Sequence, residues 1–315
     1  MKTKLAVVLI HGIGGSRETW AEPIIQKLNS RVLAELKTFL KGGAPSVISE
    51  VLITRSVYWK TVFEKPQSDL QKILDAYFKT LVGGMKFFLS FVGGWLTSFY
   101  RKQNKITTFF IGDIIGYMTK EGQTGVYEKI DDALNAALSE IPAEKRVPLS
   151  FISHSLGTVI NSQYIYDKTD AQRKKGMNFM HERLTVTNLF TVGSPLALFS
   201  MKFGGPDSFK QPVVMEDGSG RWLNFLEKED PISMPLRPLN AEYERAVNAD
   251  IQVSAGWLFG VVHTEYFEKS NTLDTIAKKL ALDWMAVNRL KADDEMALLY
   301  RKFDESFSSN LLKRS

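Results

Sequence analysis

Short apolar runs alternate with longer segments of helical spacing along most of the chain. The apolar runs occupy residues 5–10, 47–53, 147–152, 184–192, 222–226 and 247–253. Runs of this length between helices are typical of buried strands, and their alternation with helices favours a mostly parallel sheet covered on both faces. The pattern therefore predicts the α/β class, with a sheet of about six strands flanked by helices.

Three helices stand out from the spacing of their apolar residues. The first is expected over 19–40 and ends at the turn-forming residues Lys41-Gly42-Gly43-Ala44-Pro45. The second is expected over 127–138, followed by Pro142, and the third over 272–290. No repeat of domain size and no low-complexity segment interrupts this order.

The segment 66–118 does not fit the alternation, because it contains no obvious strand. Its stretch 81–100 is strongly apolar and aromatic. A pair of buried helices would explain this, whereas Lys86, four glycines and three hydroxyl residues weaken a transmembrane span. We expect a helical cap insertion instead, and basic residues around 66–105 favour contact between it and an anionic membrane. The core would then comprise 1–65 and 119–315.

Composition is ordinary for a soluble globular protein, with 44% hydrophobic and 24% charged residues in 315. The chain has no cysteine, which excludes disulfides, thiolate metal sites and a cysteine nucleophile, and is compatible with a reducing cytoplasm. We expect a cytoplasmic protein, with a peripheral position at the membrane as the open alternative. The apolar start of the chain lacks a small-residue cleavage site, so it is interpreted as a strand and not a signal peptide.

The net charge is a mild excess of +5, with an isoelectric point near 9.1. No basic run with interleaved aromatics marks a nucleic-acid module, so we expect no nucleic-acid partner. The excess suits an anionic lipid surface better.

A candidate nucleophile follows the run 147–152. Ser153-His154-Ser155-Leu156-Gly157 stands between an expected strand and an expected helix, which is the setting of a nucleophile elbow. Small residues must flank such a serine because the helix passes close to the strand. Gly157 is one, and Ser153 replaces the first glycine of the G-x-S-x-G template.

A glycine-rich loop, His11-Gly12-Ile13-Gly14-Gly15, follows the first expected strand. Its backbone N–H groups can turn toward a ligand. We expect the N–H groups of Ile13 and Leu156 to stabilise an oxyanion, and His11, Gly12 and Gly14 to line the site. The loop matches neither phosphate-binding template, G-x-x-x-x-G-K-[ST] or G-x-G-x-x-G.

The general base must be one of four histidines. His11 belongs to the glycine loop, His181 lies in a polar helical stretch, and an elbow would direct the His154 side chain away from the Ser155 hydroxyl. His154 is therefore expected to line the site only. His263 follows the last strand region and precedes a helix, and it is the predicted base.

The orienting carboxylate should follow a strand between Ser155 and His263. Asp230 comes after the run 222–226 and precedes Pro231, which favours an extended or turn conformation. It is the first choice. Glu227, Glu229 and Asp250 remain alternatives.

The order Ser155, Asp230, His263, with an early glycine loop, resembles that of the α/β-hydrolase superfamily. His11–Gly15 is similar to the oxyanion loop of small bacterial lipases, and Thr191-Val192-Gly193-Ser194-Pro195 resembles a segment found in lipase-like members. The resemblance implies a Ser-His-Asp triad, site-lining Ser194, no cofactor or metal, and a core that lacks the first two strands of the full fold. It does not extend to 66–118.

The resemblance implies an esterase acting through an acyl-enzyme, and the apolar cap favours lipid-like substrates. The same triad would also serve a thioesterase, amidase or acyltransferase. A membrane- or protein-binding module that uses the fold without catalysis is the alternative from a different class.

Overall fold

The computed structural model describes residues 2–13, 17–73, 112–177, 180–216, 218–254, 263, 265–269 and 271–307. The chain divides into two compact units. The first unit comprises Met1–Gly12, Glu18–Val57 and Asp132–Ser315, and the second comprises Ile13–Arg17 and Tyr58–Asp131.

The first unit contains a six-stranded sheet in which every strand pair is parallel, so the predicted α/β sheet is confirmed. The strand order is β2-β1-β3-β4-β5-β6. The strands are β1 (Leu5–Ile10), β2 (Leu52–Val57), β3 (Val147–His154), β4 (Leu184–Val192), β5 (Arg221–Leu226) and β6 (Ala249–Gln252).

The expected strand at 47–53 was misplaced. A 3₁₀ turn at Ile48–Glu50 precedes β2, and the strand continues through the polar residues Thr54, Arg55 and Ser56. Because β2 is an edge strand, part of it is exposed and need not be apolar, so a search for apolar runs places it too early.

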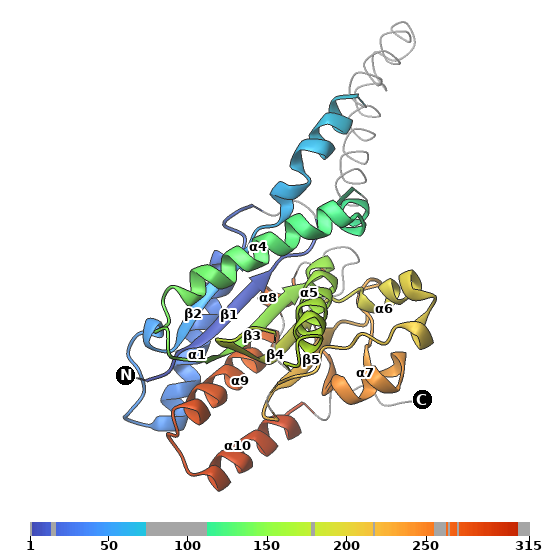
Figure 1. Cartoon of the computed structure of the whole chain (residues 1–315). Helices are drawn as coiled ribbons and strands as arrows, with labels where there is room; N and C mark the ends of the chain where they lie inside the picture. Colours follow the sequence, from blue (N-terminus) through green and yellow to red (C-terminus); the bar gives the residue numbers. More distant parts are fainter. Residues whose placement is uncertain are drawn as a thin grey trace, which may run out of the picture. The chain divides into compact units, whose positions relative to one another are not determined.

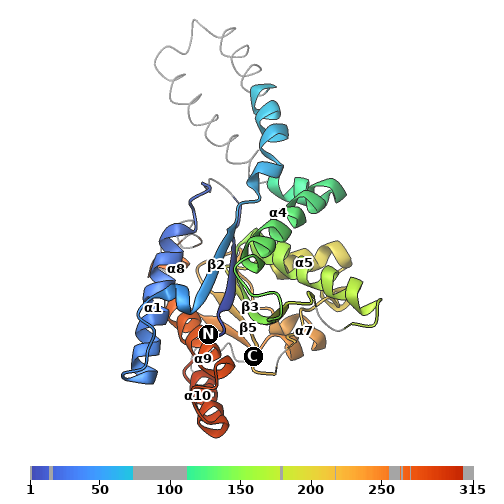
Figure 2. The same cartoon turned by 60° about the vertical axis from the view of Figure 1, so that its left-hand side comes forward.

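Helices cover both faces of this sheet (Figures 1 and 2). On one face lie α1 (Glu22–Leu40) and α9 (Thr272–Val287), and on the other lies α5 (Leu156–Arg173). Further α-helices are α4 (Lys120–Leu138), α6 (Leu196–Phe199), α7 (Ala241–Ala246), α8 (Tyr266–Lys269) and α10 (Asp293–Glu305). The helix expected at 127–138 begins seven residues earlier, because Gly122 and Gly125 interrupt the apolar spacing of its start.

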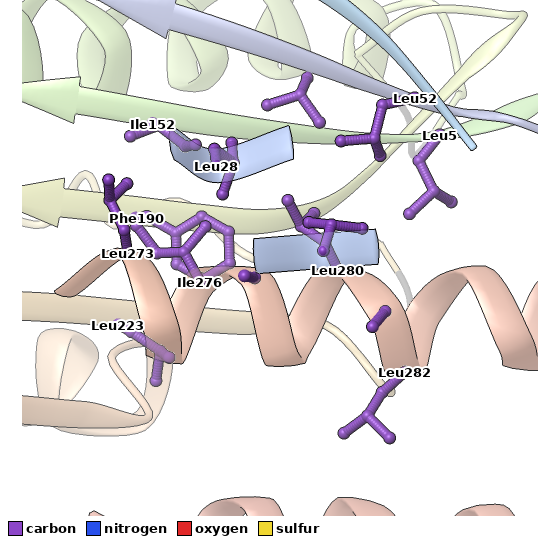
Figure 3. Close-up of a cluster of buried hydrophobic side chains, with 14 of the residues drawn as sticks. Leu5, Leu28, Leu52, Ile152, Phe190, Leu223, Leu273, Ile276, Leu280 and Leu282 are labelled. Carbon is purple, nitrogen blue, oxygen red and sulfur yellow. The ribbon is translucent and has the colours of Figure 1, made fainter. Parts of the chain in front are cut away.

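The main core lies between the sheet and the face covered by α1 and α9. Figure 3 shows Leu28 of α1 and Ile276 of α9 among strand side chains such as Ile152, Phe190 and Leu223, all of them buried. Fully burying one such side chain contributes roughly 1.5–3 kcal/mol. This packing holds the central strands, and with them the loops at their carboxyl ends.

The strand order reverses between β1 and β3. The chain moves outward from β1 to β2, and then returns to form β3 on the other side of β1. Ile10 and Ser153 are register partners at the ends of these two strands. In parallel α/β sheets, ligands bind at such a reversal, outside the carboxyl ends of the strands.

Most of the expected cap lies outside the described residues. Within 66–118, the described residues are 66–73 and 112–118, and they are mainly helical. No helix in the described ranges combines the length and the apolar character that crossing a membrane requires. The stretch 81–100 lies outside those ranges.

Candidate functional site

Ser155 occupies a strained turn between β3 and α5. Its φ is 54° and its ψ is −130°, a combination that residues with a side chain rarely adopt. The Ser155 N–H donates to the Val192 carbonyl at 3.0 Å, and its own carbonyl accepts from the Thr158 hydroxyl at 2.7 Å. The main chain on both sides is therefore anchored to β4 and α5.

The end of β1 lies directly against this turn. A Cβ atom built on Gly12 would lie 2.4 Å from the Ser155 Cβ, so only a glycine fits at position 12 without movement. His11 is buried, and its Nδ1 donates to the Gly12 carbonyl at 2.5 Å. Gly12 and Ser155, which are 143 residues apart in the chain, thus meet at one place.

The structure supports one of the two predicted oxyanion donors, Leu156, more directly than the other, Ile13. Leu156 is the first residue of α5, where helical geometry supplies no acceptor for the N–H group. Ile13 belongs to the second unit, and its role as a donor stays a prediction. Gly14 lies outside the described residues.

Ser155, His263 and Asp230 form a continuous hydrogen-bonded chain. The His263 Nε2 lies 2.8 Å from the Ser155 hydroxyl oxygen, and the His263 Nδ1 lies 2.7 Å from Asp230 Oδ2. Since the carboxylate only accepts, Nδ1 carries the proton and Nε2 faces the serine as an acceptor. The imidazole is thus oriented to remove a proton from Ser155.

The Asp230 carboxylate is fully buried in the loop after β5. Its Oδ2 accepts from the Tyr266 hydroxyl at 2.9 Å, and its Oδ1 accepts from the Ile232 N–H at 3.1 Å. Burial alone would raise the pKa of Asp230, but the contacts with His263 and these two donors together lower it. Asp230 is therefore held as an anion beside the histidine.

The alternative carboxylates are engaged elsewhere. Asp250 accepts from the Leu236 and Arg237 N–H groups and from the Asn224 amide, and burial raises its pKa. Glu227 accepts from the Lys228 N–H at 2.9 Å, and Glu229 is exposed.

Two supporting contacts were not foreseen in the sequence. The Tyr266 hydroxyl donates to Asp230 and accepts from the Glu227 N–H at 2.9 Å. A tyrosine three residues after a histidine gives no sequence signal of such a role. His154 was expected only to line the site. Its Nε2 lies 2.6 Å from the main-chain oxygen of His263.

Ser194 is buried and braces the elbow. Its hydroxyl lies 2.7 Å from the Thr158 hydroxyl, and Thr158 in turn donates to the Ser155 carbonyl. The neighbouring Gly193 has a φ of 58°, and a Cβ there would come within 3.2 Å of the His263 ring. Glycine at this position leaves room for the imidazole.

Among the residues that the structure describes, no three histidine, aspartate or glutamate side chains cluster as a metal site would require. Comparison with known proteins gave no match, neither to a family model nor to a curated protein. The interpretation of the site therefore depends on its own geometry.

Proposed function

We propose that this protein is a serine hydrolase that cleaves carboxylic esters with Ser155, His263 and Asp230. The observation that carries the proposal is the chain of two hydrogen bonds, of 2.8 and 2.7 Å, from a strained serine to a buried carboxylate. A serine is a weak nucleophile unless a base is positioned to take its proton. A sheet reversal with Gly12 beside the serine also suits this function.

In the proposed mechanism, His263 Nε2 takes the proton of Ser155 as its oxygen attacks the ester carbonyl carbon. Asp230 keeps the proton on Nδ1 and stabilises the imidazolium that forms. The imidazolium then protonates the leaving alcohol, and water releases the acyl group by the same route. The Leu156 N–H group stabilises the oxyanion, and a donor of this kind contributes roughly 3–4 kcal/mol. The second donor is assigned to Ile13 from the sequence alone.

The proposed substrates are lipid-like esters, reached at an anionic membrane surface. Support for this part comes from the sequence of 76–112, which contains five basic residues, no acidic residue and ten aromatic residues. Interfacial segments combine aromatic and basic residues in this way. The exposed apolar side chains of Leu70, Ile73 and Ile115 flank the same segment.

A fluorophosphonate probe tests the proposal, because it labels only serines that a base activates. Wild-type protein should be labelled, Ser155→Ala should not be, and His263→Ala should be labelled far more slowly. Ser162→Ala is the matched control, since Ser162 is another buried serine of α5. Folded wild-type protein that stays unlabelled with and without lipid vesicles would contradict the proposal, as would loss of labelling in Ser162→Ala alone.

Ester preference tests the substrate class separately. Hydrolysis should increase with acyl chain length and with the addition of anionic vesicles. A preference for short water-soluble esters would contradict the lipid part and leave the serine hydrolase part intact.

A further inference from the structure

His154 makes a direct contact with the residue proposed as the base. It is the last residue of β3, and its Nε2 lies 2.6 Å from the carbonyl oxygen of His263. Since a carbonyl oxygen only accepts, the His154 Nε2 donates this bond. The two imidazole rings are also packed together, with their centroids 4.9 Å apart.

The surroundings of His154 fix both its position and its charge. Its ring packs against Tyr266 and Phe267 of α8, with centroids 6.2 and 5.9 Å away. Burial, followed by the nearby His263 ring, lowers the pKa of His154 to about 3, although the hydrogen bond to the His263 carbonyl and then the charge of Asp230 act in the opposite direction. At neutral pH the ring is therefore uncharged and has a single N–H, which it places on the His263 carbonyl. An uncharged ring also avoids repelling the imidazolium that would form at His263.

The contact acts on the main chain of His263, three residues before α8 begins. Hydrogen bonds to Asp230 and Ser155 orient its ring. The bond from His154 holds its peptide group.

We propose that His154 is a positioning residue that fixes the main chain of His263 so that Nε2 faces the Ser155 hydroxyl. This inference depends on the proposed function. Because His154 and Ser155 are adjacent at the end of β3, the bond ties the base to the strand that carries the nucleophile.

Three variants test the proposal. His154→Phe keeps a planar ring and removes the donor. His154→Gln places an amide N–H about as far from the main chain as Nε2, whereas the shorter side chain of His154→Asn places it near the position of Nδ1. We expect labelling of Ser155 by the fluorophosphonate to slow at least tenfold in His154→Phe, and His154→Gln to recover more of the rate than His154→Asn.

A proton NMR measurement gives a readout that does not need turnover. The proton shared by His263 Nδ1 and Asp230 should give a strongly downfield signal in the wild type and in Ser155→Ala. It should be lost or broadened in His154→Phe, and restored in His154→Gln.

The outcomes separate the two proposals. Unlabelled wild-type protein would count against the proposed hydrolase, while the downfield signal would still report the positioning. Folded His154→Phe with the wild-type labelling rate and signal would overturn the positioning role. If His154→Phe does not fold, equal labelling rates in His154→Gln and His154→Asn would overturn it instead.

Discussion

The first turn of α5 lies so close to the end of β1 that a Cβ on Gly157 would come within 2.4 Å of the His11 carbonyl oxygen. The same Cβ would lie 2.7 Å from the Ile10 carbonyl oxygen. Both contacts are with backbone atoms of a buried strand end, which cannot move aside as a flexible side chain could.

Gly157→Ala should therefore destabilise the protein by about 1–3 kcal/mol and slow labelling of Ser155. Chemical denaturation measures the first effect. Gly43→Ala is the control, because a Cβ at Gly43 meets no atom within 4 Å. Equal denaturation midpoints for the two variants would show that the close approach is not maintained in solution.

Asp230→Asn should lower kcat by a factor of about 10³–10⁴, since an amide holds the wrong tautomer of His263. The fold should remain, because an amide can fill the same volume. Asp250→Asn is the matched control, being a buried aspartate bound to backbone N–H groups away from His263. The prediction fails if Asp250→Asn loses activity while folded Asp230→Asn retains it.

Tyr266→Phe removes the hydroxyl that bridges Asp230 and the Glu227 N–H. Loss of this buried pair of hydrogen bonds should destabilise the protein by about 1–3 kcal/mol. It should also lower kcat with little change in KM, because Asp230 loses a donor and binds the histidine less rigidly. Tyr243→Phe provides the comparison, since Tyr243 is buried and its hydroxyl donates to the Gln211 carbonyl. Equal effects on kcat in both variants would contradict a role for Tyr266 at the site.

The stability of the protein should fall as the pH drops from about 6.5 toward 3. Burial lowers the pKa of His154 to about 3, so the unfolded chain binds a proton there in a range where the folded chain does not. One such proton changes the unfolding equilibrium constant by about tenfold per pH unit.

Denaturant titrations between pH 7 and 4.5 would measure this dependence in the wild type and in His154→Phe, and the variant should lack it. Because both proteins contain Glu35 and Glu216, the comparison also cancels the contribution of these two carboxyls to the pH dependence of stability. Burial raises the pKa of both carboxyls, which makes the protein less stable as the pH rises. Identical slopes in the two proteins would mean that His154 titrates normally when folded.

Ser155→Gly should be more stable than Ser155→Ala by about 1 kcal/mol, because glycine adopts a φ of 54° without strain and alanine does not. Both variants should be inactive, so the comparison isolates backbone strain from chemistry. Thermal unfolding of the pair is the measurement. If alanine proves the more stable, strain at the elbow is not a significant part of the energy.

The sequence contained enough to locate the sheet, Ser155 and His263, and to rank Asp230 first among four candidate carboxylates. The central strands β1, β3 and β4 are mostly buried and largely apolar, so they were predictable within two residues. Ser155 could be found because a tight strand–helix crossing requires small neighbours, and His263 because it was the one histidine in a late loop. Strand β2 was placed too early because its exposed edge tolerates polar residues.

The supporting contacts were beyond the reach of sequence patterns. The bond between His154 and the His263 carbonyl involves a main-chain atom, which leaves no mark in the residue types. The choice of Asp230 over Asp250 depended on which strand-end loop turns toward the histidine. The direction of a loop follows from tertiary packing. The sequence could not decide between the two residues because Asp230 follows β5 and Asp250 lies in the next strand, β6.

The adjacency of His154 and Ser155 at the end of β3 has a thermodynamic consequence. A base carried by a loop normally retains conformational freedom that must be lost when substrate binds, and this loss opposes the reaction. Here the main chain of His263 is hydrogen-bonded to the last residue of a buried central strand, so this part of the entropy is lost when the chain folds. Under the proposed function, substrate binding would not have to order the main chain of His263 again.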